Sequence, residues 1–231
     1  KNWVICYNGE VYNFLEIKQE LQELGIQFKS TSDTEVILHA WIQWGEKCLH
    51  KFHGMFGFAI YNIIKKELTL IRDRMGVKPL YWYFHNGLFM FASELKAFHE
   101  HPRFDKTLSQ TAITEFMTFG YIRGPHSIFK HAHKLQPGSL LHINASQNIT
   151  INQYWTIPQQ TTQTKINEND FLAELKQTMK TAFNYRLVAD VPVGVFLSSG
   201  VDSSLLTAIL QENNMNKINT FTIGFDDKKS N

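Results

Sequence analysis

The sequence predicts two domains of different fold class within 231 residues: an α+β domain rich in antiparallel sheet with helices alongside, followed by the start of an α/β domain with a parallel sheet. The first class is indicated by short alternating strands, two of which (81–84 and 88–92) flank an Asn86-Gly87 turn that favours a hairpin. The second class is indicated by a short apolar run, a loop of small residues and an amphipathic helix between residues 191 and 213, then another apolar run at 220–223. A strand, a helix and a further strand in this order form a parallel unit.

The chain begins with a short strand from Trp3 to Tyr7, which is predicted to end at a turn formed by Asn8-Gly9-Glu10. A helix follows from residue 13 to residue 24, because apolar residues recur on one helical face there. Gly25 is predicted to end this helix, since glycine adopts the backbone conformation that commonly terminates helices.

A second helix is predicted to begin at a capping box, with Ser32 as the cap and Glu35 three residues on, and to end at Gly45. Strands at 56–60 and 68–72 follow, since apolar residues there alternate with smaller or more polar ones. Residues 116–141 are predicted to hold two turns that contain Gly and Pro, and then a strand.

Composition shifts near Asn144, and residues 159–163 form a polar run without apolar periodicity. We therefore predict a first domain at residues 1–158, a linker at 159–168 and a second domain at 169–231. In the second domain, an amphipathic helix with apolar residues between 172 and 183 precedes the apolar run at 193–197. A continuous apolar run of this kind suits a parallel strand covered on both faces.

The composition excludes several classes of protein. Apolar residues make up 43% and charged residues 19% of the chain, and a net charge of +2 is too small to argue for a nucleic acid or a membrane surface as partner. No run of 18 apolar residues is present, so no membrane span is expected. Because the sequence starts without Met and directly in a strand, we expect it to be an internal fragment.

Cysteine and histidine usage gives no metal site. Cys6 and Cys48 are the only cysteines, which excludes a disulfide framework and a cysteine zinc site, and both are expected to be buried small hydrophobes. The pairs at 99/101 and 131/133 have the spacing of two histidine ligands. No third ligand lies nearby in the sequence, so these histidines are expected at the surface.

A loop of small residues, Ser198-Ser199-Gly200, follows the apolar run and precedes a helix. Such a loop lets its backbone approach a ligand closely, and N–H groups at a helix N-terminus bind phosphate. No Lys follows Gly200 and no G-x-G-x-x-G is present, which excludes the Walker and dinucleotide loops. A nucleotide phosphate site is predicted, with a helix N-terminus capped by Asp202 or Ser203 as the alternative.

Residues 198–203 resemble the S-G-G-x-D-S loop of ATP pyrophosphatases, with Ser199 in place of the first glycine. Upstream, YNGEVYN (7–13), SDTE (32–35), RDRMGVKPLYW (72–82) and ASELKA (92–97) resemble, in this order, a class II glutamine amidotransferase domain. Together the motifs are similar to the glutamine-hydrolysing asparagine synthetase family over essentially the whole chain. This resemblance implies an α+β N-terminal-nucleophile-type glutaminase domain of sandwiched antiparallel sheets with helices, followed by the start of an α/β parallel-sheet ATP-pyrophosphatase domain.

The resemblance implies a glutaminase site in which a free N-terminal cysteine attacks glutamine and releases ammonia through a thioester. The side-chain amide of Asn8 and the backbone N–H of Gly9 are implied as the oxyanion hole, and Glu10 as part of the same glutamine-contacting loop. Asp33 is implied as the carboxylate that pairs with the α-ammonium of glutamine; a simple Asn-Gly turn and an acidic helix start are the alternatives. Cys6 lies inside a strand, so the nucleophile is expected upstream.

The resemblance also implies an ATP site. Its implied contacts are Leu197, Ser198, Ser199, Gly200, Val201, Asp202 and Ser203, with Ile223, at the end of the next strand, lining the adenine pocket. Asp202 is a candidate ligand for Mg²⁺ on the pyrophosphate, with helix capping as its alternative. The implied reaction is adenylation of aspartate by ATP, followed by attack of ammonia. An ATP site and few cysteines indicate the cytoplasm, and a homodimer is left open as the assembly.

Two other functions stay open. The same architecture can amidate another carboxylate, on a sugar or a peptide precursor. A non-catalytic binding protein is the second alternative, favoured by Ser199, because an added side chain crowds the phosphates. The Arg72-Asp73-Arg74 stretch belongs to the family motif without an assigned chemical role, and no turnover is expected from the 231 residues alone.

Overall fold

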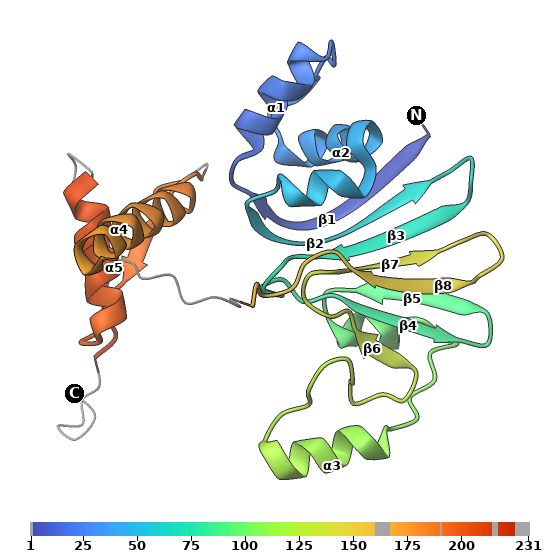
Figure 1. Ribbon diagram of the computed structural model, residues 1–231. Coiled ribbons are helices and arrows are strands. Elements are labelled where there is room, and N and C mark those ends of the chain that lie inside the picture. The colour runs from blue at the N-terminus through green and yellow to red at the C-terminus, as the bar shows by residue number, and fades with distance from the viewer. Residues whose placement is uncertain (1, 160–166, 190, 214–216, 225–231) are drawn as a thin grey trace. The chain divides into compact units, whose positions relative to one another are not determined.

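The computed structural model describes residues 2–159, 167–189, 191–213 and 217–224 (Figure 1). The chain divides into two compact units, Lys1–Pro158 and Gln159–Asn231. Of the linker predicted at 159–168, residues 160–166 lie outside the described residues. Within the described ranges, no helix is both long enough and apolar enough to cross a membrane.

Two antiparallel sheets form the first unit, as predicted. The larger sheet has the order β1-β2-β3-β7-β8 and the smaller one the order β5-β4-β6. Their strands are β1 (Trp3–Val11), β2 (Gly54–Asn62), β3 (Glu67–Arg72), β4 (Tyr81–His85), β5 (Leu88–Ala92), β6 (Ala132–Lys134), β7 (Ser139–Ile143) and β8 (Ile149–Gln153). Every pair of neighbouring strands in these sheets is antiparallel.

The larger sheet lies between a layer of helices and the smaller sheet (Figure 1). The helical layer consists of α1 (Phe14–Glu23), α2 (Asp33–Trp44) and the 3-10 helix η1 (Gly45–His50). Phe58 and Ile60 of β2 pack into the core with these helices, whereas Ala59 belongs to a second core with Leu80 and Leu141. Because side chains alternate across a strand, β2 supplies both cores of the sandwich.

A third core covers the outer face of the smaller sheet. Tyr83 of β4 is fully buried there against Phe98 and Phe104. Phe98 belongs to the 3-10 helix η2 (Leu95–Glu100), which follows β5. The aromatic residues of the β4–β5 hairpin are therefore packing residues, in keeping with their alternation along the strands.

Turn chemistry at the hairpin follows the sequence closely. Asn86 and Gly87 have φ angles of 50° and 68°, the left-handed conformation at both central positions that a two-residue hairpin needs. At α2, the Ser32 hydroxyl accepts a hydrogen bond from the Thr34 N–H, so the predicted cap is confirmed.

The other half of the predicted capping box, a bond from Glu35 back to the cap residue, is wrong. The Glu35 carboxylate accepts hydrogen bonds from the Lys29 N–H and from the N–H and hydroxyl of Ser30. The bond from the Ser30 hydroxyl is the main cause that lowers the pKa of Glu35 to about 2.

Helix α3 (Gln110–Phe119), strands β6 and β8 and the 3-10 helices η1 and η2 were not predicted. Helix α3 begins at the Ser109 cap and ends at Gly120, whose φ is 76°. Apolar residues recur at helical spacing in this helix (Ile113, Phe116 and Met117), but they are exposed, and only Ala112 and Glu115 are buried. Strand β8 lies at the edge of the larger sheet and is mostly exposed, although Ile149 and Ile151 alternate with polar residues in its sequence.

The carboxylate of Asp73, which is 1% exposed, organises the segment after β3. Its Oδ2 accepts hydrogen bonds from the N–H groups of Phe56 (3.2 Å) and Lys78 (2.9 Å). Its Oδ1 accepts from the N–H groups of Met75 (3.1 Å) and Val77 (2.9 Å). A buried charge is tolerated only when it is hydrogen-bonded in this way. The segment from residue 73 to 78 is therefore wrapped around one carboxylate.

The two arginines beside Asp73 bind backbone carbonyls. Arg72 donates to the carbonyls of Gly76, Lys78 and Leu135, and burial lowers its pKa from the ordinary value. Arg74 donates to the carbonyls of Leu49, His50 and Phe52 at the end of η1. The motif without an assigned chemical role thus ties the two sheets and the helical layer together.

The second unit contains α4 (Glu168–Tyr185), β9 (Gly194–Phe196), α5 (Val201–Asn213) and β10 (Asn219–Phe221). Strands β9 and β10 pair in parallel, which confirms the predicted strand–helix–strand unit. The expectation of a strand covered on both faces is wrong for the described residues: Val195 is buried, whereas Phe196 is 76% exposed. Residues on one face of β9 have no element packed over them within this part of the chain.

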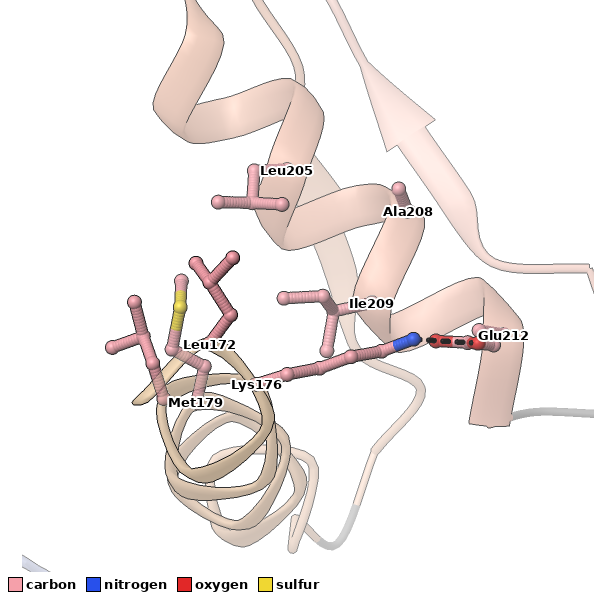
Figure 2. Close-up of a pocket in the computed structure, with 8 residues that line it drawn as sticks. Leu172, Lys176, Met179, Leu205, Ala208, Ile209 and Glu212 are labelled. Carbon is pink, nitrogen blue, oxygen red and sulfur yellow. Dashed lines mark hydrogen bonds and ion pairs between the residues drawn. The ribbon is translucent and has the colours of Figure 1, made fainter. Parts of the chain in front are cut away.

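Helices α4 and α5 pack against each other around an apolar pocket of about 500 Å³ (Figure 2). Its lining comprises Leu172, Leu175, Lys176, Met179, Leu205, Ala208, Ile209 and Glu212. Lys176 Nζ and Glu212 Oε1 form an ion pair of 2.9 Å across one end of the pocket. The predicted amphipathic face of α4 is therefore turned toward α5.

We predict that Asp73→Asn destabilises the chain by about 3 kcal/mol, because an amide NH₂ replaces an acceptor and leaves buried N–H groups unpaired. Denaturant unfolding followed by circular dichroism measures this difference. Glu23→Gln, on the exposed face of α1, is the control and is expected to change stability by less than about 0.5 kcal/mol. Equal stability of Asp73→Asn and the unmodified chain would contradict the role given to this carboxylate.

Candidate functional site

Asn8, Gly9 and Glu10 lie inside β1 and not in a turn after it, which corrects the sequence prediction. The strand continues through them because Gly9 pairs with Phe56 of β2. A Cβ at Gly9 would collide with the Met55 carbonyl oxygen and lie 2.7 Å from the Phe56 Cα. The glycine is therefore needed because two paired strands approach each other closely here. In the sequence, an Asn-Gly pair looks the same whether it serves this role or forms a turn.

Gly54 makes the matching approach from β2. A Cβ at Gly54 would collide with the Glu10 carbonyl oxygen and lie 2.9 Å from the Val11 Cα. Two glycines on facing strands thus let the backbones meet closely at the C-terminal end of β1. The backbone of the candidate site is set by strand pairing and not by a flexible loop.

Asp33 is held against β1 from the helical side. Its Oδ2 accepts a hydrogen bond from the Tyr7 hydroxyl (2.7 Å) and another from the Val11 N–H (3.1 Å). Asp33 is the first residue of α2, where the partial positive charge of the helix N-terminus stabilises a carboxylate. Burial, and next the bond to Asp33, raises the pKa of Tyr7 well above its ordinary value.

Asn8 points to the opposite side of β1. Its Nδ2 donates a hydrogen bond of 3.0 Å to the hydroxyl of Ser93, which follows β5 of the smaller sheet. A side-chain amide has two N–H donors, so this bond orients the group and leaves the second N–H for another acceptor. Tyr7 and Asn8, which are neighbours in the sequence, therefore fix Asp33 and an amide donor on the two sides of one strand.

Three predicted residues of the first unit, Asn8, Gly9 and Glu10, are consecutive in β1, and the fourth, Asp33, is bonded to the same strand through Tyr7 and Val11. The strand thus carries an amide donor suited to a developing negative charge on one side and holds a carboxylate suited to a cation on the other. Its two supporting residues, Tyr7 and Ser93, were not assigned roles from the sequence. Tyr7 lies in the motif YNGEVYN and Ser93 in the motif ASELKA. Period-two alternation along β1 was the signal that could have identified Tyr7.

The cysteine predictions hold for one residue only. Cys48 is buried, and burial raises its pKa to about 12, so it is an inert core thiol. Cys6 is exposed, which corrects the expectation of a buried hydrophobe. Its side chain falls on the Asn8 side of β1, where the register of the strand leaves alternate residues at the surface.

In the second unit, the predicted phosphate loop joins β9 to α5 and is closed by hydroxyl contacts. Ser198 Oγ and Ser203 Oγ lie 2.9 Å apart, and the Gly200 N–H donates to Ser198 Oγ. Leu197 is tied to β10 by its N–H, which donates to the Phe221 carbonyl. A parallel strand, a short loop and a helix N-terminus are the arrangement that presents N–H groups to phosphate.

The remaining predicted ATP residues are exposed. Ser199, Val201 and Asp202 face solvent, and Asp202 lies in the first turn of α5. Ile223 does not end a strand, because β10 stops at Phe221, and its side chain is 75% exposed.

A family model described as "Glutamine amidotransferase domain" matches residues 1–155, and one described as "Asparagine synthase" matches residues 174–231. Two Bacillus subtilis (strain 168) proteins are each 34% identical: asparagine synthetase (glutamine-hydrolyzing) 3 over 230 residues and asparagine synthetase (glutamine-hydrolyzing) 1 over 224 residues. The alignments cover 97% of this chain but only 37% and 35% of those proteins, so the chain spans less than half of their length.

Among solved structures, a glutamine phosphoribosylpyrophosphate amidotransferase from B. subtilis, in complex with ADP and GMP, is similar with a TM-score of 0.48 and 17% identity. That alignment covers 95% of this chain and 45% of the other.

We predict that Tyr7→Phe costs about 1 kcal/mol at neutral pH and flattens the loss of stability in alkali. The folded state keeps the Tyr7 proton above pH 10, where an unfolded tyrosine releases it, so the stability that Tyr7 supplies is present below about pH 10 and falls as pH rises. The unmodified chain should therefore lose about 1.4 kcal/mol per pH unit more than Tyr7→Phe above pH 10. Denaturant unfolding between pH 9 and pH 11 (about one unit on either side of the tyrosine pKa) tests this, and parallel curves would contradict it.

Proposed function

Because the chain belongs to the glutamine amidotransferase domain family, we propose that it is part of an ATP-dependent amidotransferase that makes L-asparagine from L-aspartate and L-glutamine. AMP, diphosphate and glutamate are the other products. The observation that carries the proposal is the Asp33 carboxylate, held by Tyr7 and Val11 on either side of Asn8-Gly9-Glu10. In this proposal residues 1–158 form the glutaminase domain, 159–168 the linker and 169–231 the synthetase domain.

In the glutaminase domain, Asp33 pairs with the α-ammonium of glutamine. The second N–H of the Asn8 amide and the backbone N–H of Gly9 stabilise the oxyanion that forms at the side-chain amide carbon. Glu10 contacts the same substrate from β1. The reaction requires a nucleophilic thiol from a segment outside the 231 residues, since the amino group of Cys6 is a peptide nitrogen within β1.

In the synthetase domain, the loop Ser198–Ser203 contacts the phosphates of ATP. Leu197, which directly follows β9, and Ile223, two residues beyond β10, contact the nucleoside. Mg²⁺ fits the chemistry of the site, because it binds one or two carboxylates together with substrate phosphates, and Asp202 presents an exposed carboxylate in the first turn of α5. Bound Mg²⁺ would supply charge neutralisation on the pyrophosphate.

The acceptor and the assembly belong to the same proposal. Aspartate is the proposed acceptor, with a carboxylate on a sugar or a peptide precursor as the alternative. The proposal also includes a cytoplasmic location and assembly as a homodimer. A non-catalytic homologue is the remaining candidate, and the hydroxymethyl group of Ser199 at the phosphate loop is the observation in its favour.

We predict that substitutions of Asp33 and Asn8 in the longer protein change different kinetic constants. Asp33→Asn should raise KM for glutamine at least tenfold with little change in kcat, because it removes a charge that binds the ground state. Asn8→Ala should lower kcat about 10²- to 10³-fold, because it removes an oxyanion donor. Glutamate release measures both. Synthesis from added ammonia is the control and should be unchanged in each variant; an unaltered KM in Asp33→Asn would reject its assignment.

Pyrophosphate release tests the synthetase half. With glutamine and ATP, the longer protein should release diphosphate when aspartate is added and not with other acids. Release with a different acid only would reject asparagine as the product, and no release with any acid would leave the non-catalytic candidate. Ser199→Gly is the matched variant: recovery of release in it alone would assign the loss to crowding of the phosphates.

A further inference from the structure

Three side chains outside the proposed catalytic sites meet in the first unit: His85, Asp105 and His131. Asp105 Oδ2 lies 3.7 Å from His85 Nε2 and 3.5 Å from His131 Nε2. One ligand atom from each residue lies within 4.8 Å of the other two. Among the described residues, no other group of three histidine, cysteine or acidic side chains is this close. The expectation that His131 has no third partner is therefore wrong, because its partners come from distant parts of the sequence.

The cluster is held by the fold around it. His85 ends β4 and His131 immediately precedes β6, the strand paired with β4, and the Phe84 N–H donates to the His131 carbonyl. The backbone N–H of Asp105 donates to the buried hydroxyl of Tyr83, which also lies on β4. All three ligands are thus attached to one end of the smaller sheet.

The carboxylate of Asp105 is oriented by Thr107. Asp105 Oδ1 accepts hydrogen bonds from the Thr107 N–H (2.9 Å) and from the Thr107 hydroxyl (2.6 Å). The other oxygen, Oδ2, is the one that faces both imidazoles. Outer hydrogen bonds that fix a ligand in this way are characteristic of metal sites.

The separations approach those of a three-ligand metal site. With metal–ligand bonds of about 2.0–2.2 Å in tetrahedral geometry, ligand atoms lie about 3.3 Å apart, close to the observed 3.5 and 3.7 Å. The two imidazoles are stacked, with centroids 3.9 Å apart and planes at 14°. An ion shared by both rings therefore requires one ring to turn about χ2, a torsion with a broad range in histidine.

We propose that His85, Asp105 and His131 bind a divalent transition-metal ion of the Zn²⁺ class through Nε2, Oδ2 and Nε2. Two imidazoles and one carboxylate suit such ions and do not suit Mg²⁺ or Ca²⁺, which prefer oxygen ligands. The three side chains are 25–31% exposed, so an ion reaches the site from solvent. The remaining coordination positions are open to water.

Zinc binding to the purified chain tests the proposal, with isothermal titration as the first measurement. We expect one Zn²⁺ per chain, no displacement by excess Mg²⁺, and visible d–d absorption of bound Co²⁺ with nitrogen and oxygen ligands. Circular dichroism establishes that each variant is folded. His131→Ala and Asp105→Asn should each weaken Zn²⁺ binding at least tenfold, and Thr107→Val should weaken it by about tenfold through the orientation of Asp105.

His39→Ala is the matched control. His39 also lies beside a carboxylate, Glu35 at 3.9 Å, but without a third ligand among the described residues. Its substitution should leave the affinity for Zn²⁺ unchanged. Absence of stoichiometric Zn²⁺ binding by the unmodified chain, or equal affinity in folded His131→Ala, would overturn the proposal. If a variant does not fold, the Co²⁺ spectrum of the unmodified chain decides by itself, since featureless absorption also overturns it.

Discussion

The carboxylate of Asp73, buried at the end of β3, is the interaction on which the rest of the first unit depends. It receives four backbone N–H groups, one of which belongs to Phe56 of β2. Phe56 is also the partner of Gly9 in β1, so the strand that carries the candidate site is paired to a residue that Asp73 holds. Arg72 binds the carbonyl of Leu135, which follows β6 of the smaller sheet, and Arg74 binds the carbonyls of Leu49 and His50 in η1. The site therefore rests on a buried polar framework, where each group is satisfied and breaking one partner is costly.

The alternation of side chains along β1 explains how the motif YNGEVYN contacts both the helical layer and the smaller sheet. Alternation sends Tyr7 toward α2, where it holds Asp33, and sends Asn8 toward the end of β5, where it meets Ser93. Gly9 lies between them with no side chain, which allows the close pairing with β2. A rigid strand positions donors more firmly than a loop does, and this suits groups that must be in place before charge develops. The metal cluster that we propose at the end of β4 follows the same principle, with ligands attached to a paired strand.

Local features were predictable where short-range chemistry decides the conformation. The Asn86-Gly87 hairpin and the Ser32 cap were predicted, because each depends on backbone preferences of a few adjacent residues. Helix α3 and strand β8 were not predicted, although apolar residues recur at the spacing of each element, at 113, 116 and 117 in the helix and at 149 and 151 in the strand. The Asn8-Gly9 pair was predicted as a turn, because a glycine needed for strand approach looks the same in sequence as a glycine needed for a turn. Neither the periodicity of apolar residues nor the residues typical of turns shows which strand a given strand pairs with.

By itself, the sequence determined the two fold classes, the order of motifs and the chemical types of the site residues. These follow from apolar periodicity, caps and residue identity, all of which are local. Only the tertiary structure decided that Asp33 meets Tyr7 and Val11, that Ser93 meets Asn8, and that His85 and His131 share Asp105. The physical reason is that these contacts join residues that are 20 positions (His85 and Asp105) to 85 positions (Asn8 and Ser93) apart in the sequence. Their proximity is set by sheet register and core packing, which no local pattern encodes.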